Sequence, residues 1–332
     1  MKTNTTTNLQ DLVLKILNPD TPFAEIENSI NNIHQYFHET IGIASFEDSI
    51  PNLAAVNTAK GKALGMNHAA KCLLDYKRTV KFLKGMVAAI KKKQAIHPNE
   101  KIHIFYAGCG PYAPFVTLVA QLFTSEEIQF DVLEINALAL DHAKKLISGL
   151  GLNDYVGEYY QADAITFQFE KDKDYHILYS ETLDALLFRE CYVPILFNML
   201  PQLSEDIYVV PNNVQVSMNL SLMSMTNEEY KADKTETILD VRQSVLEHAS
   251  TKSIPKKLPQ ITVNVKELNI EDYNYFSLDT KVNIFEDIWL ERNESSLTIP
   301  LEMEIHKPFD FSKMVFTYEM KDSIELKYQL FE

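Results

Sequence analysis

Residues 105–112 read Phe-Tyr-Ala-Gly-Cys-Gly-Pro-Tyr, an apolar run that ends in a turn with two glycines. The run begins at Ile102 and is typical of a short buried strand, and residues 115–123 after the turn are typical of a helix. A glycine turn between a strand and a helix lets the backbone approach a ligand closely, where the helix N-terminus faces it. This stretch therefore predicts the first strand and turn of a Rossmann-like α/β fold.

The same alternation continues through residues 98–211. Strands are expected at residues 130–134, 156–161, 177–180 and 207–210, and helices at residues 137–150 and 193–199. Strands that alternate with helices predict a parallel sheet that is covered on both faces. We therefore expect residues 98–211 to form one α/β domain of the Rossmann-like class.

The regions on either side follow other patterns. Residues 1–97 carry apolar residues at helical spacing, including a long helix expected over residues 67–94. In residues 212–332, apolar and polar residues alternate in short runs, which predicts an antiparallel, barrel-like β domain. A charged stretch at about residues 227–248 interrupts these runs and is expected to be a helical insertion.

The composition excludes several classes of protein. A formal net charge of −15 over 332 residues repels the phosphates of a nucleic acid. The three cysteines, Cys72, Cys109 and Cys191, form no closely spaced pair, so we expect neither a disulfide framework nor a metal site. The N-terminus lacks the apolar core of a signal peptide, and no apolar run reaches the ~20 residues of a membrane span. We therefore expect a cytoplasmic protein that binds neither nucleic acids nor membranes.

Three features in chain order predict a nucleotide-type cofactor site. Gly108 and Gly110 form the turn, Glu134 ends the second strand, and Asp163 follows the third. A carboxylate after the second strand is placed to hold ribose hydroxyls, and one after the third can accept from an adenine amino group. Each acid alone is also typical of a solvated loop, and the turn lacks the third glycine of the dinucleotide fingerprint. Together the features favour a class I methyltransferase that uses S-adenosyl-L-methionine over an NAD enzyme.

A pair of glutamates follows the strand expected at residues 177–180. Residues 180–190 read Ser-Glu-Thr-Leu-Asp-Ala-Leu-Leu-Phe-Arg-Glu, which places Glu181 and Glu190 at the two ends of one loop. Two carboxylates can bind one guanidinium through paired hydrogen bonds and fix its plane. This arrangement predicts a cationic substrate and a catalytic role for both glutamates. The alternative is that Glu190 starts a helix and that Glu181 pairs with Arg189.

Two further motifs lie outside the cofactor turn and the glutamate loop. Residues 74–79 read Leu-Asp-Tyr-Lys-Arg-Thr, an Asp-x-x-Arg-Thr pattern, and Pro211 opens the last region. With the turn and the loop, these motifs resemble the protein arginine methyltransferases over residues 65–220. The resemblance implies an S-adenosyl-L-methionine-dependent enzyme in which Arg78 holds the methionine carboxylate. A surface ion pair with Asp75 is the alternative for Arg78.

The chain departs from this family in three places. Tyr106 stands where an acid is usual before the turn, and neither the tyrosine-rich helix that closes the family's site nor its Thr-His-Trp loop is recognisable. Trp289, the single tryptophan, is the expected counterpart of that loop in substrate binding, with core packing as its alternative. Asp184 adds a third acid inside the glutamate loop, for a substrate amino group. The departures favour a small cationic molecule, such as free arginine, as the substrate whose guanidino group is methylated.

Two other functions remain open. The same scaffold also suits an O- or C-methyltransferase of specialised metabolism, for which the glutamates matter less. It also suits a non-catalytic partner protein that binds the cofactor, although an intact glutamate pair speaks against that function. The resemblance further implies a homodimer, with residues 227–248 as the candidate arm between subunits.

Overall fold

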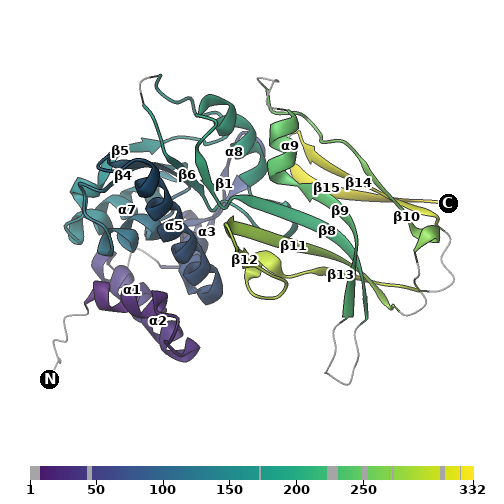
Figure 1. The fold of residues 1–332 in the computed structure, drawn as a ribbon, viewed down its shortest axis with the longest axis horizontal. Helices are drawn as coiled ribbons and strands as arrows, with labels where there is room; N and C mark the ends of the chain where they lie inside the picture. Colours follow the sequence, from purple (N-terminus) through teal and green to yellow (C-terminus); the bar gives the residue numbers. More distant parts are fainter. Residues whose placement is uncertain are drawn as a thin grey trace.

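The chain combines an α/β part with a part made of two antiparallel sheets. The two parts lie side by side in Figure 1. This computed structural model describes residues 8–42, 47–171, 173–222, 231–248, 253–268, 270, 273–306, 311–321 and 323–332, with the backbone alone for residues 231–235. The N-terminal helices, the parallel sheet and the antiparallel sheets follow one another along the chain. The predicted fold class is confirmed: a Rossmann-like α/β core, an N-terminal helical region and a C-terminal antiparallel β region.

The parallel sheet has five strands in the order β5-β4-β3-β6-β7. The strands are β3 (Ile102–Ala107), β4 (Ile128–Glu134), β5 (Val156–Gln161), β6 (Ile177–Ser180) and β7 (Tyr208–Val210), and all pairs are parallel. Helices α7 (Ala137–Gly149) and α8 (Tyr192–Met199) lie between strands in the chain. The strand order reverses between β3 and β6, and ligands of open α/β sheets bind at such a switch point.

The N-terminal region is helical as predicted, but its long helix is interrupted. The region contains α1 (Leu9–Leu17), α2 (Phe23–Ile41), α3 (Ile50–Leu53), α4 (Met66–Lys71) and α5 (Tyr76–Ile96), and a two-stranded hairpin, β1 (Val56–Asn57) and β2 (Lys62–Ala63), precedes α4. The helix expected over residues 67–94 breaks at Asp75, whose ψ of 85° is not helical. The Asp75 carboxylate accepts hydrogen bonds of 2.8 Å from the Ser295 hydroxyl and from the hydroxyl and backbone N–H of Ser296. A distant contact therefore fixes the break.

The predicted helix over residues 115–123 is also shorter than expected. It consists of α6 (Pro114–Thr117) and a 3₁₀ turn at Val119–Gln121. The chain enters it through Ala113 with φ 39°, a left-handed conformation that follows the glycine turn. Phe115 and Val116 are buried, so packing rather than a regular helix places this segment.

The antiparallel part, predicted as barrel-like, consists of two sheets. One contains β8 (Asn213–Leu222), β9 (Lys231–Asp240), β11 (Tyr275–Phe285), β12 (Ile288–Leu290) and β13 (Leu301–Glu304). The other contains β10 (Ile261–Asn264), β14 (Lys313–Met320) and β15 (Ile324–Phe331). Within the described ranges, no strand of one sheet pairs with a strand of the other.

The helical insertion predicted at residues 227–248 is wrong for most of its described length. Residues 231–240 form β9, which pairs with β8, and only α9 (Val241–Glu247) is helical; residues 227–230 lie outside the described residues. Val241 and Val245 are buried within the same chain, while Leu246 is 61% exposed. These two buried valines of the candidate dimer arm, residues 227–248, thus pack inside the subunit. The homodimer itself stays a prediction.

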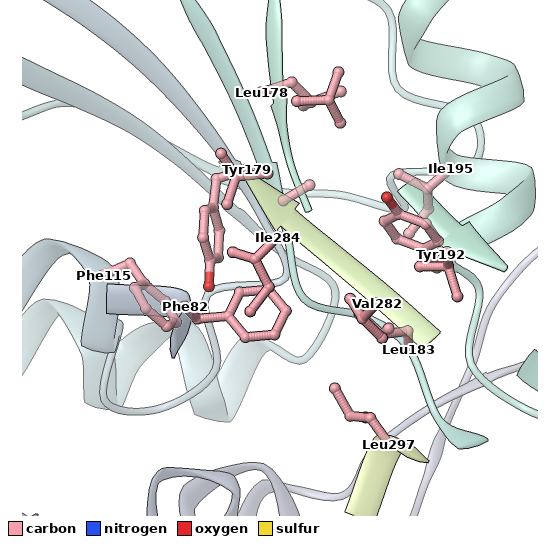
Figure 2. Packing of buried hydrophobic residues seen from close by; sticks show 14 of the residues in the cluster. Phe82, Phe115, Leu178, Tyr179, Leu183, Tyr192, Ile195, Val282, Ile284 and Leu297 are labelled. Carbon is pink, nitrogen blue, oxygen red and sulfur yellow. The ribbon is translucent and has the colours of Figure 1, made fainter. Parts of the chain in front are cut away.

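Aromatic and aliphatic side chains join the two parts of the molecule at helix α5. Figure 2 shows Tyr179 of β6 beside Phe82 of α5, Phe115 and Ile284 of β11. The ring centroids of Phe115 and Tyr179 lie 4.4 Å apart. Gly85 of α5 faces Ile284, and a Cβ at this position would overlap the Ile284 side chain. The glycine therefore lets the helix pack directly against β11.

Candidate active site

A cavity opens at the carboxyl ends of β3 and β6, the switch point of the parallel sheet. It encloses about 1060 Å³ of empty space, part of which is open to solvent. Seven of the residues predicted to form the site line it: Arg78, Gly108, Gly110, Glu134, Asp163, Glu181 and Glu190. The structure thus brings together residues that are more than 100 positions apart in the sequence.

The turn after β3 has the backbone conformation that requires glycine. Gly108 has φ +80° and Gly110 has φ +61°, values that side-chain-bearing residues rarely adopt. A Cβ on Gly108 would also overlap the side chain of Thr182. Both glycines line the cavity, so the turn contributes backbone to the cavity wall.

The two acids after β4 and β5 accept hydrogen bonds from the backbone at the cavity wall. Glu134 is 7% exposed and accepts from the N–H groups of Gly110 at 2.8 Å and of Asn136 at 2.9 Å. Burial raises the pKa of Glu134, and these N–H groups oppose the rise. Asp163 accepts from the backbone N–H of Ala59 at 2.6 Å and of Ile165 at 2.9 Å. Both carboxylates are therefore held in fixed orientations at the cavity.

Arg78 of α5 and Glu181 at the end of β6 form an ion pair inside the cavity. Their side chains are 6% and 11% exposed, and the Arg78 Nε donates to Glu181 Oε1. Burial works against the charge on Arg78, but Glu181 outweighs it and raises the pKa of Arg78. Within the described residues, no hydrogen bond is made by the two terminal nitrogens of Arg78, which leaves them for an anion in the cavity. The predicted alternative, a pair between Glu181 and Arg189, does not form.

Glu190 is the second carboxylate of the pair, and its ionised form is less stabilised than that of Glu181. Burial raises the pKa of Glu190 to about 7; Arg78 opposes this rise, while the acids Asp184 and Glu181 add to it. Glu190 does not start a helix, since α8 begins at Tyr192. Of the two glutamates of the loop, Glu181 is therefore paired with Arg78, whereas the charge of Glu190 would be stabilised by a cationic ligand.

Contacts from within the loop and from the antiparallel sheets shape the segment between the two glutamates. Asp184 Oδ1 accepts from the N–H groups of Arg189 at 3.2 Å and of Glu190 at 3.3 Å. Leu186 and Leu187 have φ 59° and 56°, which is rare for such residues. Thr280 of β11 accepts from the Leu186 N–H at 2.8 Å, and Tyr318 of β14 donates to the Leu187 carbonyl at 2.9 Å.

Asp184 and Trp289, predicted to bind substrate, are not among the residues that line the cavity. Asp184 instead turns one carboxylate oxygen to the backbone of its own loop, as the contacts above show. Trp289 lies in β12, partly buried, and its carbonyl accepts from Lys81 Nζ at 2.7 Å. Tyr106, which replaces the usual acid, lines the cavity and packs edge-on against Tyr179 with ring centroids 4.9 Å apart.

The sequence did not predict two parts of the cavity wall. All three cysteines line it: Cys72, Cys109 and Cys191. Burial raises the pKa of Cys72 and of Cys191 to about 11, so these thiols stay protonated at neutral pH. The β1–β2 hairpin also contributes Thr58, Lys62 and Ala63, and no motif in its short sequence points to this role.

A cluster with metal-binding side chains lies at the opposite edge of the parallel sheet. Among the described residues, His97, Glu100 and His176 bring ligand atoms within 4.8 Å of one another. However, His176 Nδ1 accepts from the backbone N–H of His103 at 3.0 Å, so neutral His176 carries its proton on Nε2. Neither nitrogen of His176 then offers a lone pair without breaking this contact, and we assign no ion to the cluster.

Comparisons with known proteins support the fold. No protein-family model matches the sequence, and no curated protein matches it either. Among solved structures, Arabidopsis thaliana protein arginine methyltransferase 10 is similar with a TM-score of 0.51 at 10% identity, over 80% of this chain and 97% of that chain. The chain shares its fold with this methyltransferase. The PRMT1 enzyme–prozyme heterotetrameric complex of Trypanosoma brucei with AdoHcy also matches, with a TM-score of 0.47 at 10% identity, over 79% of this chain and 96% of that chain.

Proposed function

We propose that the protein is an S-adenosyl-L-methionine-dependent N-methyltransferase that acts on a guanidino group, with free arginine or a similar small molecule as acceptor. The observation that carries the proposal is the position of Glu181 and Glu190 in the same cavity as the glycine turn and Arg78. A cofactor site and a pair of carboxylates in one cavity suit the transfer of a group to a cation.

The residues of the cavity fit this cofactor. The terminal nitrogens of Arg78 suit the methionine carboxylate, because a guanidinium can engage both carboxylate oxygens. Glu134 would hold the ribose hydroxyls, and Asp163 would accept from the adenine amino group. Gly108 and Gly110 leave the room that a ligand needs beside the turn. When bound, S-adenosyl-L-methionine supplies an electrophilic methyl group on its sulfonium.

The two glutamates would hold the acceptor and move its proton. Their carboxylates pair with the N–H groups of the guanidinium and direct one nitrogen along the line of transfer. The transferred methyl adds a positive charge, which the nitrogen loses as a proton. Glu190 is the better acceptor for that proton, because its pKa of about 7 is raised by burial while Glu181 is already paired with Arg78.

Two observations support a small acceptor over a protein arginine. Trp289 does not line the cavity, so the family's substrate loop has no counterpart in this part of the wall. The N-terminal region, in which no tyrosine-rich helix is recognisable, instead contributes the β1–β2 hairpin to the cavity wall. The third acid, Asp184, turns Oδ1 to the backbone of its own loop, and the proposed contact with a substrate amino group would use its other oxygen.

A transfer assay tests the proposal. The protein is incubated with cofactor labelled in the methyl group and with free guanidines, amines, phenols and arginine peptides, and the products are read by mass spectrometry. We expect label on a guanidino nitrogen. Label on oxygen or carbon would replace the proposal with an O- or C-methyltransferase. Binding of NADH without S-adenosyl-L-methionine would remove the cofactor assignment.

Three further expectations accompany this function. We propose domain boundaries at residues 97/98 and 211/212, a cytoplasmic location and a homodimer. None of the helices in the described part of the chain has both the length and the apolar character that a membrane crossing needs. Light scattering at micromolar concentration tests the assembly, since the monomer mass is 38.1 kDa.

A further inference from the structure

The β1–β2 hairpin, Val56–Ala63, forms part of the cavity wall. Its strands pair Val56 with Ala63 and Asn57 with Lys62. The Thr58 hydroxyl accepts from the N–H groups of Lys60 at 3.3 Å and of Gly61 at 2.9 Å. The Thr58 N–H also donates to the Gly61 carbonyl at 2.9 Å. Thr58 thus fixes the tip of the hairpin from its own side chain.

The tip contacts both ends of the cavity. Towards the proposed adenine end, the Ala59 N–H donates to Asp163 at 2.6 Å. Towards the glutamate loop, the Thr58 hydroxyl lies 3.2 Å from Cys191 Sγ, directly after Glu190 in the chain. The hairpin therefore bridges the loop after β5 and the loop after β6.

Gly61 shows how closely the hairpin lies against the glutamate loop. A Cβ on Gly61 would be 3.2 Å from the Arg189 carbonyl oxygen and 3.4 Å from Cys191 Sγ. Distances of this kind leave no space for another main chain between the hairpin and residues 189–191. A polypeptide lying across the loop that carries Glu190 would collide with the hairpin.

We propose that this hairpin determines the acceptor of the reaction: it admits small guanidines and excludes arginines within a polypeptide. The inference rests on the proposed function and adds the element that sets its specificity. A free guanidine needs only the cavity, whereas a peptide must also place backbone on both sides of its arginine. The Ala59–Asp163 and Thr58–Cys191 contacts hold the hairpin over the cavity against such a chain.

Two variants and a control test the role of the hairpin. Thr58→Ala removes the acceptor of two backbone hydrogen bonds and the contact with Cys191. Gly61→Val adds atoms towards the Arg189 carbonyl and so pushes the tip away without removing a hydrogen bond. Asn57→Ser is the matched control, because Asn57 lies on the same hairpin, is exposed and does not line the cavity. Cofactor affinity by calorimetry and the thermal midpoint verify that each variant folds.

The readout is kcat/KM for free arginine relative to that for an arginine-containing peptide. For the wild type and Asn57→Ser we expect a preference for free arginine of roughly 100-fold or more, as for a site that rejects a substrate by its shape. In Thr58→Ala we expect this preference to fall by roughly 3- to 10-fold, since a lost turn contact is worth on the order of 1 kcal/mol. In Gly61→Val we expect a fall in the same direction, because the added side chain displaces the tip of the hairpin.

Three outcomes count against the inference, and they are distinguishable. Equal use of peptide and free arginine by the wild type overturns it and leaves the methyltransferase function standing. An unchanged preference in both folded hairpin variants also overturns it, because another element then sets the preference. Cofactor binding without transfer to any acceptor overturns the proposed function, and the inference with it.

Discussion

Arg78 and Glu181 meet in the cavity although they come from different elements, the first turn of α5 and the carboxyl end of β6. Arg78 is 5% exposed, so its charge depends on the Glu181 carboxylate. Among the described residues, Glu190, the other member of the glutamate pair, makes no such bond, and burial raises its pKa to about 7. Two glutamates with the same predicted role therefore differ in what each contributes to stability.

Glu181→Gln should destabilise the protein at neutral pH. The substitution leaves Arg78 as a buried cation without its anion, and breaking a buried ion pair on one side costs about 3 kcal/mol. Chemical denaturation gives the change in the free energy of unfolding. Glu126→Gln, at an exposed glutamate that does not line the cavity, is the control and should change stability little. A stability of Glu181→Gln equal to that of the control would show that the pair contributes nothing.

Glu190→Gln should have the opposite effect, which should grow as the pH rises above 4.5 and be complete above about pH 7. The raised pKa means that the native state keeps a proton that the unfolded chain has released between pH 4.5 and about 7. The free energy of unfolding therefore falls as the pH rises through this window. The amide of Gln cannot ionise, so it removes the free-energy cost of a buried charge. We therefore expect the free energy of unfolding to rise by about 1–3 kcal/mol at pH 8 and to stay unchanged at pH 4. Denaturation curves at both pH values measure it; equal gains at both would contradict the ionisation argument.

Turnover should depend on the ionised form of Glu190. If the carboxylate holds the guanidinium, kcat/KM falls as the pH drops below about 7, where Glu190 becomes protonated. Above pH 7, Glu190→Gln should lower turnover by roughly 10²–10³ while cofactor affinity stays the same, because one charge-assisted interaction with the reacting group is lost. Initial rates from pH 5.5 to 9 test both statements. A flat profile in the wild type would remove Glu190 from the chemistry.

Asp184 should act through the position and the charge of Glu190. Asp184→Asn keeps an oxygen for the N–H groups of Arg189 and Glu190 but removes a negative charge that raises the pKa of Glu190. We expect the acid limb of the pH–rate profile to move to lower pH with little loss of maximal rate. Asp184→Ala also loses the acceptor, so maximal kcat should fall by roughly tenfold, the equivalent of one hydrogen bond. Identical profiles for both variants and the wild type would mean that Asp184 only fills space.

Glu134 should control cofactor affinity. Glu134→Ala leaves the N–H groups of Gly110 and Asn136 without their acceptor and removes the proposed partner of the ribose hydroxyls. The affinity for S-adenosyl-L-methionine should fall by about 1–3 kcal/mol, with the acceptor KM unchanged. Calorimetry measures the affinity, and circular dichroism verifies the fold. Full affinity in a folded variant would place the ribose elsewhere.

Much of the α/β core was predictable because its signals are local. Most of the parallel strands are short apolar runs with turn residues after them, and the observed bounds of β5 and β6 agree with the expected strands at residues 156–161 and 177–180. The glycines and acids predicted for the cofactor site follow these strands, so strand order alone brings them to one edge of the sheet. The glutamate loop was found for the same reason.

Other features depend on contacts that no local pattern encodes. The break at Asp75 exists because Ser295 and Ser296 bind its carboxylate. The segment 231–240 is rich in charged residues, and its pairing with β8 decides that it is a strand. The contacts of Asp184 with the backbone of its own loop were not predicted, because the sequence does not reveal which way a loop carboxylate turns.

The loop between the glutamates owes its shape to residues that come much later in the chain. Thr280 and Tyr318 hold Leu186 and Leu187 in a backbone conformation that these residues would not choose alone. A ribosome completes the parallel sheet well before it makes either of those anchors. Under the proposed function, the newly made part would supply the cofactor-binding residues first, and the glutamate loop would reach its final shape only when the last strands have folded onto it. Truncated or partly folded chains would then bind the cofactor without transferring its methyl group.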